Sequence, residues 1–224
     1  SIVDVFDKDG NEIFKTNLVS SRVADICMSQ DSKLLAIAEV DLSGILIQSK
    51  IQVVSMELAQ NRPNEAILYK YEAPTDKLIM NIEYQEQNKL VCIYNDGIEC
   101  LQENKSTELA KFENRQLAFT TIELNNSIVF VEEVSTGEYT ADTKVKIINS
   151  ETSKETEYVT KNVAKSILTS NNKIAINFGT ELHIIDKNGF LVKKYISDSE
   201  INNIVMTDAL VGIVYKDKIQ IINI

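Results

Sequence analysis

Short apolar runs separated by polar turns recur along the whole chain. Five runs share one form, an apolar segment rich in β-formers that directly follows polar turn residues, and they cover 33–37, 89–93, 127–131, 173–176 and 209–213. Runs of this length bounded by Asn, Asp, Ser and Gly are typical of β-strands. The pattern therefore predicts an all-β chain.

Each run belongs to a larger repeat. A second apolar segment follows it, beginning at Ile51, Ile98, Val145, Leu182 and Ile219, so the period is roughly 37–49 residues. A third and a fourth segment precede the next run. Four short strands per period are typical of a β-propeller blade. The sequence predicts one domain over 1–224, a β-propeller of four-stranded antiparallel blades with about five blades visible.

Other arrangements are less consistent with this repeat. A β-sandwich also contains many short strands, but it does not repeat one four-strand order five times. Helix-like spacing occurs only in Met56–Tyr71, where Pro63 interrupts it. An additional strand at Ile2 resembles the one at Ile219 and is surplus to five blades. Either further blades precede residue 1, which leaves a truncated or incompletely closed ring here, or one terminal strand lies outside the pattern.

Two tight turns of the same kind are expected, at Asp7-Lys8-Asp9-Gly10 and Asp186-Lys187-Asn188-Gly189. Polar residues followed by a glycine at positive φ close a β-hairpin. The alternative is a calcium loop at the first of them, but Gly10 is fourth from Asp7, whereas a calcium hand places glycine sixth. A hairpin turn is the favoured interpretation.

The composition limits which partners and which kinds of catalytic site are consistent with the chain. The net charge is −10, which argues against nucleic acid as a partner. The single histidine, His183, lies in an apolar stretch and is expected to be a strand residue. No phosphate loop, no metal-ligand spacing and no catalytic constellation is visible. The expectation is a non-enzymatic chain without a cofactor. The alternative is a propeller hydrolase or lyase with a site at the central channel.

Two hairpins are longer than the repeat needs, at 40–50 and 132–143. Both connect the second strand to the third, so both are expected on one face. Long loops often carry function. The hypothesis is a partner-binding rim that includes Leu42, Ile45, Ile47 and Tyr139. The alternative is that Ile45 and Ile47 pack on a neighbouring blade.

Three cysteines allow one testable pairing. If Asn95-Asp96-Gly97 is a three-residue loop with Gly97 at positive φ, Cys92 faces Cys100 across a hairpin, and a disulfide could form. Cross-strand bridges are strained. The alternative is free thiols, with Cys27 unpaired in either case.

Two resemblances add to this interpretation. The segment 2–15 resembles the blade of quinoprotein-like propellers, although Phe14 stands at the family's tryptophan position and the chain has no tryptophan, which removes the case for a quinone cofactor. Over nearly its whole length, notably at 33–40, 145–149 and 212–219, the chain resembles an uncharacterised family of membrane-anchored propellers from Gram-positive anaerobes. That resemblance implies the C-terminal part of a longer protein, anchored by an N-terminal helix and facing outward.

The function expected from these observations is an extracytoplasmic binding or scaffold module for a protein or a polysaccharide. Its membrane contact would be made only through the upstream helix. An intracellular interaction scaffold in the cytoplasm is the alternative location and role.

Overall fold

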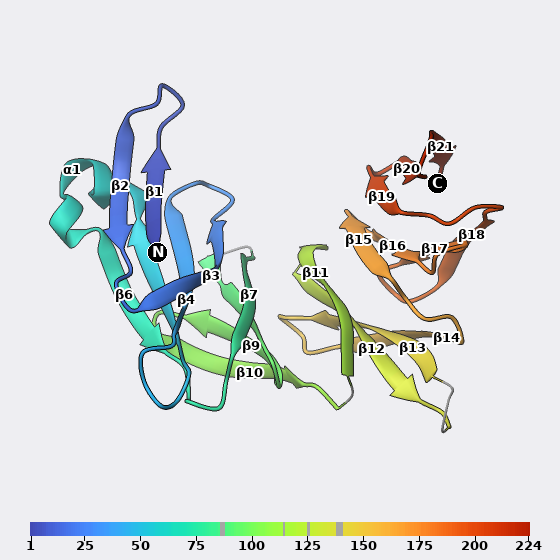
Figure 1. Ribbon diagram of the computed structural model, residues 1–224, viewed down its shortest axis with the longest axis horizontal. Helices are drawn as coiled ribbons and strands as arrows, with labels where there is room; N and C mark the ends of the chain where they lie inside the picture. Colours follow the sequence, from blue (N-terminus) through green and yellow to red (C-terminus); the bar gives the residue numbers. More distant parts are fainter. Residues whose placement is uncertain (86–87, 114, 125, 138–140) are drawn as a thin grey trace. The chain divides into compact units, whose positions relative to one another are not determined.

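A computed structural model of the chain describes residues 1–85, 88–113, 115–124, 126–137 and 141–224; the side chains of 115–124, 135 and 141 are not described. The contacts divide it into two compact units, Ser1–Phe112 and Glu113–Ile224. Figure 1 labels most of the elements of both units. The predicted all-β fold is confirmed.

The first unit contains a hairpin and two four-stranded antiparallel sheets. The hairpin is β1 (Ile2–Phe6) with β2 (Glu12–Asn17). One sheet has the order β3 (Ser21–Met28), β4 (Leu34–Asp41), β5 (Gln48–Ser55) and β6 (Ile67–Glu72), and the other is β7 (Ile79–Tyr84), β8 (Leu90–Tyr94), β9 (Gly97–Gln102) and β10 (Lys105–Lys111). A short helix, α1 (Met56–Asn61), and a 3₁₀ turn, η1 (Pro63–Glu65), connect β5 to β6.

The second unit contains two four-stranded sheets and one three-stranded sheet. The first is β11 (Arg115–Leu124), β12 (Ser127–Ser135), β13 (Ala141–Asn149) and β14 (Glu155–Thr160). The second is β15 (Ser166–Ser170), β16 (Lys173–Asn177), β17 (Glu181–Asp186) and β18 (Leu191–Ile196). The third is β19 (Asn203–Met206), β20 (Leu210–Val214) and β21 (Ile219–Asn223).

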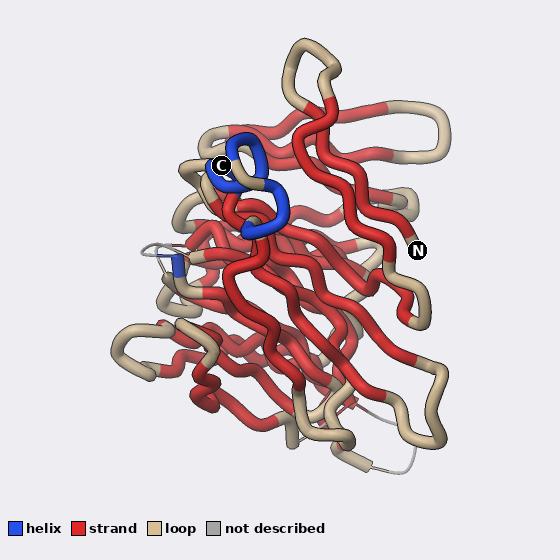
Figure 2. Tube along the Cα trace, turned by 90° about the vertical axis from the view of Figure 1, so that its left-hand side faces the viewer, coloured by secondary structure: helices blue, strands red, loops and turns tan. Residues whose placement is uncertain are grey.

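Among the described residues, four of the predicted quartets are present as four-stranded sheets in chain order, and the last set forms the three-stranded sheet β19–β21. Figure 2 shows how strand dominates the trace and how little of it is helical. Pro63 begins η1, so the helical spacing of the 56–71 stretch is realised only over the six residues of α1. Ser55 caps α1 by accepting a hydrogen bond from the Leu58 N–H at 3.2 Å.

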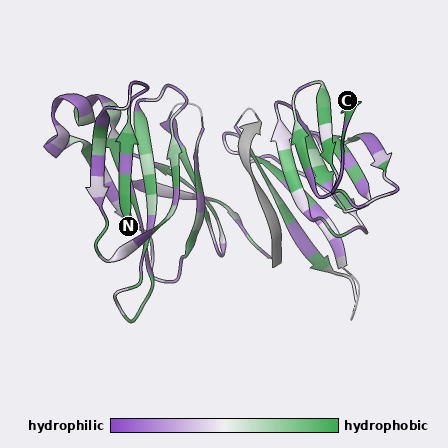
Figure 3. Cartoon of the chain, turned by 45° about the horizontal axis from the view of Figure 1, so that its top comes forward, coloured by the Kyte–Doolittle hydropathy of each residue, from purple (hydrophilic) through white to green (hydrophobic). Residues whose placement is uncertain are grey.

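The apolar runs form the second strand of each sheet because that strand is covered on both faces. All five residues of β8 are fully buried, and β4 and β16 are mostly buried. Fourth strands such as β14 and β18 are largely exposed, with alternating burial in β14. Figure 3 shows hydrophobic colour concentrated in the strands. This is the expected distribution for sheets that stack face to face.

Two clusters pack the first unit. One joins its two sheets through residues such as Ala36, Ile51, Ile82 and Leu90. The other packs the β1–β2 hairpin and α1 on the first sheet, and Phe14 is buried in it.

The two expected turns have the predicted geometry. Gly10 has φ +86° and Gly189 has φ +80°. In each turn one aspartate oxygen accepts two backbone hydrogen bonds: Asp7 Oδ1 from Asp9 N and Asn11 N at 2.9 and 2.8 Å, and Asp186 Oδ1 from Asn188 N and Phe190 N at 2.8 and 2.9 Å. The hairpin-turn interpretation is confirmed for both segments.

Candidate functional site

The loop between β4 and β5 presents an apolar tip. The exposed fractions of Leu42, Ile45, Leu46 and Ile47 are 52%, 104%, 63% and 46%. Figure 1 shows this loop extending beyond its sheet. The alternative that both isoleucines pack on a neighbouring blade is wrong for Ile45, which is fully exposed. Leu46 adds a fourth aliphatic side chain that the sequence argument left out.

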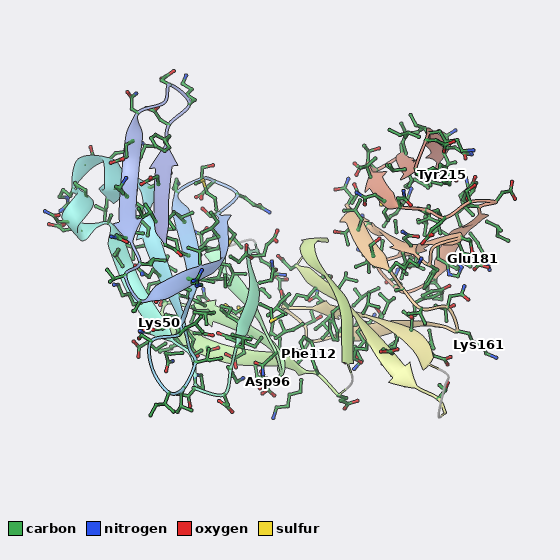
Figure 4. The ribbon with its side chains drawn as sticks, in the orientation of Figure 1. Lys50, Asp96, Phe112, Lys161, Glu181 and Tyr215 are labelled. Carbon is green, nitrogen blue, oxygen red and sulfur yellow. The ribbon has the colours of Figure 1, made fainter. Side chains whose placement is uncertain are left out.

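The base of this hairpin is held firmly by Asp41. Its Oδ1 accepts hydrogen bonds from Ser43 N at 3.0 Å and from Ser43 Oγ at 2.6 Å. Its Oδ2 lies 3.2 Å from both Lys50 Nζ and Ser20 Oγ. The bonds from Ser43 hold the pKa of Asp41 well below its ordinary value, so the carboxylate stays ionised and the network persists at neutral pH. Lys50 is labelled in Figure 4.

A hollow of about 530 Å³ adjoins the tip. It is lined by the β2–β3 loop and by the base of the β4–β5 hairpin, through Ser1, Val19, Ser20, Ser21, Arg22, Leu42 and Ser43. Val19 is almost fully exposed. Leu42 was expected at this surface from the sequence. Val19 and Arg22 were not, because neither belongs to a local motif.

We name this surface the hairpin rim and define it as Val19, Arg22, Leu42, Ile45, Leu46 and Ile47. It combines aliphatic side chains with one guanidinium and has a rigid base. A surface of this kind can bind another macromolecule, but it carries no pair of groups for acid–base or nucleophilic chemistry.

The other long hairpin differs from the expectation. Residues 132–135 and 141–144 are not a loop insertion; they extend the β12–β13 ladder, with Ser135 opposite Ala141. Glu132 is fully buried within it. Tyr139, the fourth predicted rim residue, lies outside the described residues.

The hairpin of the two predicted partner cysteines has a different register. Only Asn95 and Asp96 separate β8 from β9, and Gly97 is not at positive φ. Cys92 consequently pairs with Glu99, and Cys100 pairs with Val91. The premise that Cys92 faces Cys100 is wrong, and all three cysteines are free thiols in the structure.

One cluster in the second unit contains groups that enzymes use. His183 Nδ1 lies 2.7 Å from the Tyr158 hydroxyl, and His183 Nε2 lies 3.1 Å from Glu181 Oε2, which also receives Lys194 Nζ at 2.8 Å. Glu181 is labelled in Figure 4. His183 is a buried residue of β17, as its apolar context predicted.

The protonation of this cluster does not suit catalysis. Burial raises the pKa of the Tyr158 hydroxyl and lowers the pKa of His183. The tyrosine is therefore not activated as a nucleophile, and the imidazole stays neutral at physiological pH. Phe178 packs against the imidazole at 4.7 Å between ring centroids. The arrangement is that of a satisfied buried histidine.

Within the described residues, no group of histidine, cysteine and acidic side chains is placed to hold a metal ion, and no helix has the length and apolarity needed to span a bilayer.

Comparison with known proteins supports the fold. Kluyveromyces lactis Hsv2 is similar with a TM-score of 0.57 and 12% identity, over 91% of this chain and 75% of that one. The extracellular domain of the putative hybrid two component system BT4673 from B. thetaiotaomicron gives a TM-score of 0.60 and 15% identity, over 97% of this chain and 29% of that one.

The C-terminal WD40 domain of Sif2 gives a TM-score of 0.56 and 10% identity, over 100% of this chain and 75% of that one. At these identities the likeness shows a β-propeller-like fold alone. No curated protein matches the sequence. A family model matches residues 1–224 throughout, and the chain belongs to the family of unknown function DUF5711.

Proposed function

We propose that the chain is a non-enzymatic β-propeller module that binds a protein partner through the hairpin rim. The observation that carries the proposal is the full exposure of Ile45 on a hairpin whose base is fixed by Asp41. Because the base of the hairpin is already fixed, that part of the chain loses little conformational entropy on binding.

The energy available is sufficient for a specific contact. Full burial of a Leu or Ile side chain stabilises by about 1.5–3 kcal/mol. Leu42, Ile45, Leu46 and Ile47 together thus present apolar surface whose burial contributes to a protein interface. The tip is aliphatic, which suits an apolar groove on a protein better than a polysaccharide.

We further propose that the module faces outward on a membrane-anchored protein. This location rests on the resemblance to anchored propellers, and the likeness to an extracellular domain of a two component system is consistent with it. Resistance of the protein to a membrane-impermeant amine reagent in intact cells would contradict the outward location.

Site-specific photocrosslinking in the native cell tests the binding proposal. A photoreactive amino acid replaces Ile45 in the full-length protein, and a matched variant carries it at Leu68, an exposed apolar position of the same sheet. We expect one defined crosslinked protein from position 45 and none from position 68. No product at position 45, or the same products at both positions, would contradict the proposal.

A further inference from the structure

A small polar cavity lies in the second unit, where the β13–β14 turn meets the β17–β18 turn. Its volume is about 140 Å³, and it is lined by Ser127, Ile147, Asn149, Thr152, Lys154, Thr156, Lys187 and Asn188. Seven of these eight side chains can donate or accept hydrogen bonds. The cavity shares no residue with the hairpin rim.

The β17–β18 turn is packed tightly on β14, which fixes one wall of the cavity. A Cβ atom at Gly189 would lie 2.7 Å from the Glu157 carbonyl oxygen, so the two backbones are as close as glycine permits. Thr156 Oγ1 donates a hydrogen bond to the Lys187 carbonyl at 3.3 Å, and Lys187 N donates to the Asn172 carbonyl at 3.1 Å. Lys187 and Asn188 are thereby held over the cavity.

The β13–β14 turn fixes the opposite wall. Asn149 Oδ1 accepts hydrogen bonds from Glu151 N at 3.1 Å, Thr152 N at 2.8 Å and Thr152 Oγ1 at 2.9 Å. The amide oxygen of Asn149 is thus committed to the turn. Lys154 lies two residues after Thr152 and is the second lysine that lines the cavity.

The charged residues that line the cavity are two lysines, although the chain as a whole carries −10. Neither Lys154 nor Lys187 forms an ion pair within the described part of the chain. The nearby glutamates of β14 lie on the strand's other face, where Glu155 pairs with Lys146 at 3.0 Å and Glu157 with Lys144 at 3.2 Å. The carboxylate of Asp186 is occupied by backbone N–H groups of its own turn.

We propose that this cavity binds the oxyanion group of a phosphate or a sulfate. Two lysine side chains, whose ammonium groups act as adjustable point charges, line the same polar hollow. The cavity volume of about 140 Å³ leaves room for a small oxyanion group. The group can be a free inorganic ion or an ester on a larger ligand.

Calorimetric titration with sodium phosphate and sodium sulfate, at an ionic strength held constant with sodium chloride, tests the proposal. We expect saturable binding to the natural chain, and at least a tenfold weaker affinity in the Lys154→Gln/Lys187→Gln double variant. The matched control is Lys161→Gln, an exposed lysine of the same unit that does not line the cavity and is labelled in Figure 4.

The other possible outcomes either overturn the proposal or identify the form of the bound anion. Equal binding to the natural chain and the double variant, or loss of binding in the Lys161→Gln control, would overturn the proposal. So would the absence of saturable heat with both anions while circular dichroism shows folded protein. Tighter binding of glycerol phosphate than of inorganic phosphate would support an ester as the ligand, and weaker binding would support the free ion.

Discussion

Replacing Gly189 with alanine tests whether the β17–β18 turn is packed on β14 as the structure has it. Gly189 has φ +80°, where an L-residue costs about 1–2 kcal/mol. Its new Cβ would also lie 2.7 Å from the Glu157 carbonyl oxygen, and this neighbour is backbone that cannot move aside cheaply. Overpacking of this kind costs about 1–3 kcal/mol. We expect Gly189→Ala to lower the free energy of unfolding by about 2–5 kcal/mol in total.

Two other glycines separate the backbone term from the packing term. Gly10 has φ +86° and no neighbouring atom within 4 Å of an added Cβ. Gly179 has φ +92°, and the added Cβ would meet only the flexible end of the Lys165 side chain at 3.0 Å. Both alanine variants should therefore cost about 1–2 kcal/mol, the conformational term alone.

Urea unfolding of the three variants, followed by far-ultraviolet circular dichroism, measures these differences. Gly179 and Gly189 flank the same strand, β17, so their comparison does not depend on whether the two units unfold together. The reasoning is refuted if Gly189→Ala is no more destabilised than Gly179→Ala.

Two further predictions follow from buried titratable groups. Burial raises the pKa of the Cys27, Cys92 and Cys100 thiols, so a thiol reagent at pH 7 should react slowly with the native chain. In denaturant without reductant, the same reagent should titrate three thiols. A count of one thiol would instead indicate a disulfide bridge. Burial lowers the pKa of His183 in the folded chain. Below the ordinary histidine pKa of 6.5, the unfolded chain therefore binds a proton at this residue more readily than the folded chain does. The free energy of unfolding should therefore fall as the pH decreases from about 6.5 toward 5, and His183→Gln should remove that slope; an unchanged slope in the variant would contradict the burial effect.

Much of the fold was predictable because each strand carries its own signal. Leu90–Tyr94 is an uninterrupted apolar run between polar turns, and a run of that kind is stable only when both faces of the strand are covered. The same local signal recurs in every period. The order of strands within each sheet then followed from their order along the chain.

The register of the β8–β9 hairpin was not predictable from its turn. Gly97 looked like a positive-φ residue, but its actual role is close approach: an added Cβ would clash with the Ala110 carbonyl oxygen on β10. That contact is made between two strands and cannot be inferred from the residues of the turn. The error of one position moved Cys100 away from Cys92 to the place opposite Val91.

The functional surfaces were predictable only in part. The apolar tip was visible in the sequence, but the exposure of Ile45 was not, because an isoleucine in a long loop can either pack or protrude. The polar cavity was not visible at all. Part of its lining comes from neighbouring strands of one sheet, but Lys187 and Asn188 come from a turn of the next sheet, and only the packing of the two sheets brings them to the cavity.

The exposure of the hairpin tip is the central claim, and one fluorescence measurement tests it directly. The chain contains no tryptophan, so Ile45→Trp introduces a single indole reporter on the tip. In the isolated chain we expect the emission of a fully solvated indole with free access to acrylamide, followed by a blue shift and protection when the partner binds. A blue-shifted and protected indole in the isolated chain would show that the tip packs on its own protein, and the proposed binding surface would be lost.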